Sequence, residues 1–204
     1  MARPKAFDTA AALERAMELF WQQGYAATSM EQLVAVMGIS RQSLYDTYGD
    51  KHALFLAAID SYCAMLAAEL LGPLQAPDAG LAALHATAMG LVDFIIRYPK
   101  RRACLMANTA LELGPHDEIV AAKVRAHMAA MEAAFRHALV NARARGEIHA
   151  AADPDSLARY LVAMANGLLV MGKSGAGRDQ LTQMAQVAAS ALQPMAPQPA
   201  ALPA

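Results

Sequence analysis

Apolar residues recur three or four positions apart along most of the chain, with polar residues between them. This spacing places the apolar side chains on one face of a helix, so it predicts a series of amphipathic helices separated by Gly and Pro turns. The expected helices cover about 9–23, 29–37, 41–48, 50–71, 81–97, 101–113, 116–145, 153–173 and 178–192. The pattern predicts an all-α protein.

Composition agrees with this prediction. Ala makes up roughly a quarter of the chain and Leu and Met are abundant, whereas the β-branched residues that favour strands are few. The net charge of −1 and the 17% of charged residues are compatible with a folded domain and exclude a strongly basic coat. Two cysteines are too few for a disulfide framework in 204 residues.

The N-terminal residues lack the apolar core of a signal peptide, and no uninterrupted apolar run reaches the ~18 residues of a membrane span. We therefore expect a cytoplasmic protein with no membrane partner. Residues 194–204 are rich in Pro and are expected to form a disordered tail.

The segment TSMEQLVAVMGISRQSLYDTYGDK (28–51) contains two short helices separated by a glycine. Thr28 with Glu31, or Ser29 with Gln32, fits a capping box at the start of the first helix. Gly38 permits a tight turn before the second helix. Two helices in this arrangement form a helix-turn-helix, whose second helix can enter the major groove of DNA.

GISRQSLYDTYGDKHALF, together with the upstream AMELFWQQGYAATSMEQL, resembles the DNA-binding signature of TetR (tetracycline-repressor-like) transcriptional regulators. The resemblance covers about residues 8–55. Gln42 and the pair Asp46-Thr47 depart from residues common in that family, and these departures bear on the operator sequence. Residues 1–55 hold five basic and six acidic side chains, so the position of each cation matters more than any excess.

The resemblance implies a three-helix DNA-binding domain at 1–50, followed by a helical effector-binding and dimerisation domain at 51–193. It also implies a homodimer formed by the last two helices, at 153–173 and 178–192, in which we expect Leu161 and Leu168 to contact the partner. In the second helix of the motif, Arg41 and Gln42 are expected to read base edges. The expected DNA-binding residues are Thr28, Ser40, Arg41, Gln42, Ser43, Tyr45, Thr47, Tyr48 and Lys51.

The family resemblance implies a small-molecule effector pocket in the C-terminal domain. Cys104, Asn108 and Glu112 are spaced by four residues, so they are expected on one helix face at the pocket wall. Lys100, Arg101 and Arg102 would lower the pKa of Cys104 and make it reactive toward electrophiles. Reversible binding of an effector at this wall is the alternative, and a buried structural cysteine is the simplest interpretation.

Other motifs do not indicate chemistry. His116, Asp117 and Glu118 are adjacent in sequence and do not share a helix face, so no metal site is predicted. GKSGAG (172–177) lacks the spacing of a phosphate-binding loop and is expected to be a turn. No cofactor and no enzymatic activity are predicted. The expected function is a DNA-binding transcriptional regulator, a repressor released from a palindromic operator by its effector. The alternatives are a small helical enzyme and a helical adaptor without DNA binding.

Overall fold

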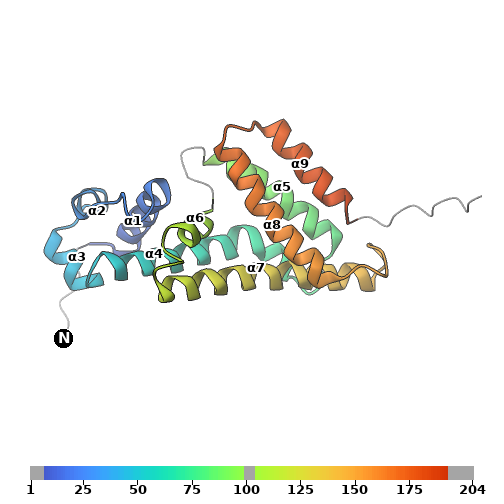
Figure 1. Ribbon diagram of the computed structural model, residues 1–204, viewed down its shortest axis with the longest axis horizontal. Helices are drawn as coiled ribbons and strands as arrows, with labels where there is room; N and C mark the ends of the chain where they lie inside the picture. The colour runs from blue at the N-terminus through green and yellow to red at the C-terminus, as the bar shows by residue number, and fades with distance from the viewer. Residues whose placement is uncertain (1–6, 99–103, 193–204) are drawn as a thin grey trace, which may run out of the picture.

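The computed structural model describes residues 7–98 and 104–192, which form helices joined by short turns (Figure 1). The N-terminal helices are α1 (Thr9–Gln23), α2 (Met30–Met37) and α3 (Arg41–Tyr48). The next helix, α4 (Lys51–Leu66), continues as a π-helical turn, η1 (Ala67–Leu71), and a 3₁₀ turn, η2 (Gly72–Gln75). The remaining helices are α5 (Leu81–Arg97), α6 (Leu105–Glu112), α7 (Glu118–Ala144), α8 (Pro154–Lys173) and α9 (Arg178–Ser190). The all-α prediction is confirmed.

Polar residues just before the helices fix where several of them begin. The Asp8 carboxylate accepts hydrogen bonds from the backbone N–H groups of Ala10 and Ala11, at the start of α1. Such a side-chain cap contributes roughly 0.5–2 kcal/mol of helix stability. Comparable side-chain caps start five other helices and are provided by Ser29, Ser40, Asp50, Asp117 and Asp153.

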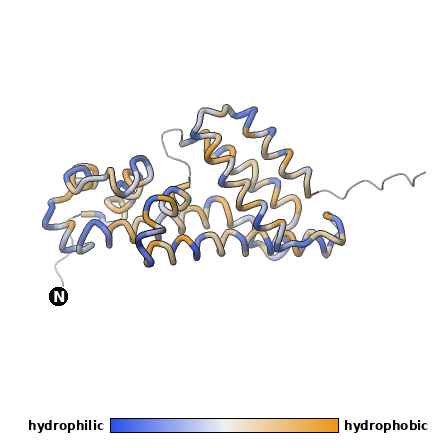
Figure 2. Tube along the Cα trace, viewed as in Figure 1, coloured by the Kyte–Doolittle hydropathy of each residue, from blue (hydrophilic) through white to orange (hydrophobic). Residues whose placement is uncertain are grey.

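The helices α1–α3 lie at one end of the molecule, and α5, α8 and α9 stack over α7 at the other end (Figure 1). Helix α4 leads from the first group to the second, and α6 lies between them (Figure 1). Figure 2 shows hydrophilic residues concentrated around α3, at the tip of the N-terminal group. The predicted reading helix therefore lies in a hydrophilic part of the surface.

One continuous hydrophobic core connects the two groups of helices. Trp21 of α1 packs edge to face against Tyr62 of α4, with ring centroids 4.7 Å apart. Phe20 packs in the same way against Phe55, at 4.9 Å. Trp21 also stacks on Phe94 of α5. The predicted domain boundary after residue 50 falls just before α4, and α4 packs against helices of both groups. A division of the chain into two domains at this point stays a prediction.

The segment Lys51–Gln75 is the one helix of the described residues that is long and apolar enough to cross a membrane, judged by length and composition alone. Asp60 and Glu69 interrupt its apolar sequence. Leu54, Phe55 and Ile59 of this helix are buried in the core next to α1. Packing in the core therefore accounts for these apolar residues of the helix.

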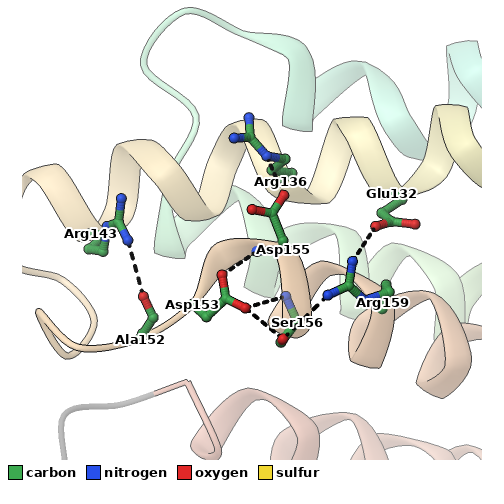
Figure 3. A network of polar contacts seen from close by, with 8 residues as sticks. All are labelled: Glu132, Arg136, Arg143, Ala152, Asp153, Asp155, Ser156 and Arg159. Atoms are coloured by element: carbon green, nitrogen blue, oxygen red, sulfur yellow. Dashed lines mark hydrogen bonds and ion pairs between the residues drawn. The ribbon is translucent and has the colours of Figure 1, made fainter.

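Polar contacts fix the beginning of α8 against α7 (Figure 3). Arg136 of α7 donates to Asp155, and Glu132 of α7 accepts from Arg159 at 3.3 Å. Arg143 donates to the carbonyl oxygen of Ala152, just before α8. These contacts join the first turns of α8 to α7, beside the buried residues of the two helices that pack together.

Candidate nucleic-acid interface

The turn between α2 and α3 has the geometry that the sequence predicts for a helix-turn-helix. Ser29 and Gln32 form the capping box: the Ser29 hydroxyl accepts from the Gln32 N–H, and the Gln32 side chain accepts from the Ser29 N–H. Gly38 ends α2 in the left-handed conformation, with φ of 69°. Leu33, which is buried, holds α2 to the core, and Leu44 does the same for α3.

Because Leu44 packs into the core, the opposite side of α3 faces solvent. Arg41, Gln42, Tyr45 and Asp46 are exposed along one side of this helix. An α-helix with its side chains is about 10–12 Å in diameter, and the major groove of B-DNA is about 12 Å wide, so α3 can enter the groove. The surface of α3 presents donors and acceptors of the kinds that read base edges.

Within α3 and α2, the two predicted base-reading side chains are held by carboxylates. Arg41 forms an ion pair with Glu31 of α2 at 3.4 Å, and its guanidinium lies over the ring of Tyr45. The Gln42 amide nitrogen donates to Asp46 at 2.7 Å. These pairs are exposed and contribute little to stability, so both side chains can exchange these partners for bases.

Four other predicted contact residues lie on or beside α3. The Ser40 hydroxyl accepts from the backbone N–H of Ser43 and caps α3, and the two serine hydroxyls lie 2.8 Å apart. Lys51 places its ammonium 4.3 Å from the centre of the Tyr25 ring, and burial lowers the pKa of Lys51. Thr47 is half-buried on α3. Contacts of these residues with DNA stay predictions.

Two further predicted contact residues have hydrogen-bond partners within the protein, and their contacts with DNA stay predictions. Thr28 is only 1% exposed, and its hydroxyl donates to the carbonyl oxygen of Gly24, so it stabilises the turn before α2 and does not face solvent. Tyr48 is half-buried, and its hydroxyl donates to the carbonyl oxygen of Thr9. This bond ties α3 to the beginning of α1. Arg3 and Lys5, two of the basic residues near the N-terminus, lie outside the described residues.

Glu112 connects the DNA-binding helices to the C-terminal part, a role that sequence reasoning missed. Its carboxylate accepts from the backbone N–H groups of Tyr25, at 3.0 Å, and Ala26, at 2.7 Å. A side chain on Gly24 would collide with this carboxylate, so the turn after α1 and the end of α6 are closely fitted. A place for Glu112 in an effector pocket stays a prediction.

His52 and Asp117 form a second connection. The His52 ring nitrogen Nε2 lies 2.6 Å from Asp117, which also caps α7. Since its partner lies 65 positions away, no sequence pattern indicates the pair. In the described parts of the chain, no group of three His, Cys, Asp or Glu residues could hold a metal ion.

Cys104 lies inside the C-terminal domain, where an effector pocket was predicted. It is buried at the beginning of α6 and accepts a hydrogen bond from the Tyr62 hydroxyl at 3.5 Å. Burial raises the pKa of the Cys104 thiol, although Tyr62 and the N–H groups of Ala107 and Met106 act in the opposite direction. Lys100, Arg101 and Arg102 lie outside the described residues. The burial of the thiol favours the interpretation of Cys104 as a structural cysteine.

Comparisons with known proteins agree with this geometry. Residues 12–58 match the model of bacterial regulatory proteins of the tetR family, and residues 80–189 match the tetracyclin repressor-like C-terminal domain. The chain belongs to the TetR family. It is a transcriptional regulator with an N-terminal helix-turn-helix domain and a C-terminal helical domain.

Relatives of known name are similar over nearly the whole chain. The uncharacterized HTH-type transcriptional regulator YezE of Bacillus subtilis is 39% identical over 94% of this chain and all of the relative. The HTH-type transcriptional repressor ComR of Escherichia coli is 32% identical over 90% of this chain and 88% of the relative. A cysteine mutant of the TetR family regulator CifR, solved with a 26-base-pair operator DNA, has a TM-score of 0.81. It is 28% identical, over 94% of this chain and all of that one.

We expect replacement of Glu31 by Gln to strengthen operator binding about two- to fivefold, because one negative charge beside α3 is removed and Arg41 is released. The pKa of the Glu31 carboxyl is lowered by its own backbone N–H, by Ser29 and by Arg41, so the group is ionised at neutral pH. Fluorescence anisotropy with labelled operator measures the change. Glu118→Gln, on the exposed surface of α7, is the control and should leave affinity unchanged. Equal affinities of wild type and Glu31→Gln would show that this ion pair does not compete with DNA.

Proposed function

We propose that this protein is a homodimeric cytoplasmic repressor that binds a palindromic operator through α3 and is released by a small-molecule effector. The observation that carries the proposal is the exposed polar side of α3, braced by the buried Leu44 and by the tight turn at Gly38. The repressor name of ComR and the operator DNA bound to CifR support this assignment. The regulatory character of these relatives also supports a protein without enzymatic activity.

The proposed dimer forms through α8 and α9. Val170 of α8 is 51% exposed and Val187 of α9 is 67% exposed, so both helices leave apolar side chains uncovered in the single chain. Leu168, predicted to contact the partner, is 3% exposed, and Leu161 also faces the interior of the subunit. A charge at Leu161 or Leu168 would damage the core, so Val170 and Val187 are the appropriate positions to test.

We infer that α6 transmits the state of the C-terminal domain to the DNA-binding helices. At the N-terminus of α6, Cys104 contacts Tyr62 in the interior of the protein. At the C-terminus, the Glu112 carboxylate accepts hydrogen bonds from the turn at Tyr25 and Ala26. A shift of α6 would therefore move this turn directly. Helix α4, which packs against α1 on one side and α6 and α7 on the other, offers a second route.

Replacing Glu112 by Ala should weaken this connection, because the N–H groups of Tyr25 and Ala26 lose their acceptor. We expect hydrogen exchange at these two amides to accelerate at least about tenfold, with little change in the amides of α8. Glu132→Ala, which removes a partly exposed carboxylate on α7, is the control. Unchanged exchange at Tyr25 and Ala26 would show that Glu112 does not hold the turn.

Transcription in vitro tests the proposed function. The template is the promoter next to the gene, because a regulator of this kind commonly has a palindrome nearby. The protein should lower the amount of transcript, and removing the palindrome should abolish the effect. Unchanged transcript would refute regulation at this promoter, and an increase would show an activator.

A further inference from the structure

Two neighbouring cavities lie inside the C-terminal domain and share part of their walls. The first, of about 40 Å³, lies between α4, η1, α5, α7, α8 and the beginning of α6. The second, of about 50 Å³, lies between α5, α7, α8 and α9. Thr87, Leu91, Phe135 and Ala165 line both cavities. Both are far smaller than the roughly 300–1,000 Å³ of a site for a drug-sized ligand.

Two polar atoms in the first cavity have no hydrogen-bond partner in the protein. Thr87 is 7% exposed, and its hydroxyl oxygen Oγ1 is unpaired. Asn166 donates from its amide nitrogen to the carbonyl oxygen of Val162 at 2.9 Å, whereas its carbonyl oxygen Oδ1 is unpaired. Buried polar atoms in proteins nearly always have a partner, so two unpaired atoms at one cavity indicate a site for a polar group of a ligand.

The described residues in the rest of the cavity wall provide no countercharge for a charged ligand. Phe94 and Phe135 contribute aromatic surface, and most of the other lining side chains are aliphatic. Among the described residues, no Asp, Glu, Lys or Arg lines either cavity, and His85 lines the second. An ionised carboxylate or ammonium group would lose its hydration there without gaining a countercharge.

The hydrogen-bonding properties of the two atoms define the polar group. Asn166 Oδ1 only accepts, whereas the Thr87 hydroxyl both donates and accepts. A hydroxyl group on the ligand can donate to Asn166 and accept from Thr87. We propose that this cavity binds the effector, and that the effector is a compact, uncharged, mainly apolar molecule with a hydroxyl group, a phenol or an alcohol. This inference rests on the proposed effector-released repressor.

The position of the cavity also explains how binding would reach DNA. Cys104 and Tyr62, which are bonded to each other, line the first cavity, and Cys104 immediately precedes α6. A ligand that needs more space than this cavity offers would displace Cys104 and hence α6. The contact of Glu112 with the turn at Tyr25 and Ala26 would then change. Such a ligand favours the conformation that does not bind DNA.

Calorimetric titration of the full chain with four probes tests the ligand class. Phenol and benzyl alcohol should bind saturably, toluene about tenfold more weakly, and benzoate not measurably at the same concentrations. Thr87→Val keeps the shape of the side chain and removes its hydroxyl, so it should weaken benzyl alcohol binding about tenfold and leave toluene binding unchanged. Thr182→Val, on α9 and outside both cavities, is the control and should bind all probes like wild type.

Three results would overturn the inference: no saturable binding of either hydroxyl compound, binding of benzoate as tight as that of benzyl alcohol, or equal behaviour of Thr87→Val and Thr182→Val. DNA binding is measured on the same preparations by anisotropy. Operator binding without alcohol binding refutes the ligand class alone. Alcohol binding to a protein that does not bind its operator refutes the proposed function and leaves the cavity assignment standing.

Discussion

Replacing Arg41 by Ala should weaken binding to the operator roughly tenfold to a hundredfold and relax the preference at one base pair in each half-site. Arg41 is exposed near the beginning of α3, where a reading helix contacts base edges. An arginine can donate two hydrogen bonds to guanine, so its loss removes base discrimination as well as charge. Binding to a library of operators with single base-pair changes measures both effects.

The matched control for this substitution is Arg125→Ala. Arg125 is exposed on α7 and forms an ion pair with Glu118, so its removal changes the net charge equally without touching α3. The control should bind the operator like wild type. If Arg41→Ala bound with wild-type affinity and kept the preference at every position, Arg41 would not be a base-reading residue.

Replacing Val187 by Asp should convert the dimer to a monomer and reduce operator affinity at least about a hundredfold. The mutation places a charge in the apolar surface that we propose to be buried against the partner, where it would lack a countercharge. A monomer engages only one half-site, so it loses about half of the DNA contacts. Val170→Asp, on α8, should act in the same direction.

Ile119→Asp is the control for these substitutions. Ile119 is an exposed apolar residue on α7, outside α8 and α9, so the same change there should leave the dimer intact. Sedimentation gives the oligomeric state, and anisotropy gives the affinity for the same samples. A Val187→Asp protein that is still dimeric, or a monomer that binds the palindrome with wild-type affinity, would contradict the proposed interface.

The helices and the reading face could be predicted because their signals are local. Asp8, Ser29 and Ser40 bond to N–H groups two or three residues away, and Gly38 supplies a backbone conformation that other residues avoid. The period of apolar residues then shows which side of each helix is buried. On α3 this reasoning separates the buried Leu44 from the exposed Arg41, as the structure shows.

The contacts between distant segments could not be predicted in the same way. Glu112 lies on the expected helix, but its partners, Tyr25 and Ala26, are more than 80 positions away, so helix spacing alone placed it at a pocket. Thr28 and Ser29 both fit a cap, and only the packed structure shows that Thr28 is buried. The unpaired atoms of Thr87 and Asn166 are likewise visible only after four helices are assembled around them.

Titration of a labelled duplex that carries the palindrome next to the gene tests the central claim most directly. A duplex of the same composition in shuffled order is the reference, and salt is varied from about 50 to 200 mM. The predicted result is saturation at two chains per palindrome, at least about a thousandfold tighter than for the shuffled duplex, with affinity falling steeply as salt increases. Equal affinity for the two duplexes would contradict the claim that α3 reads an operator.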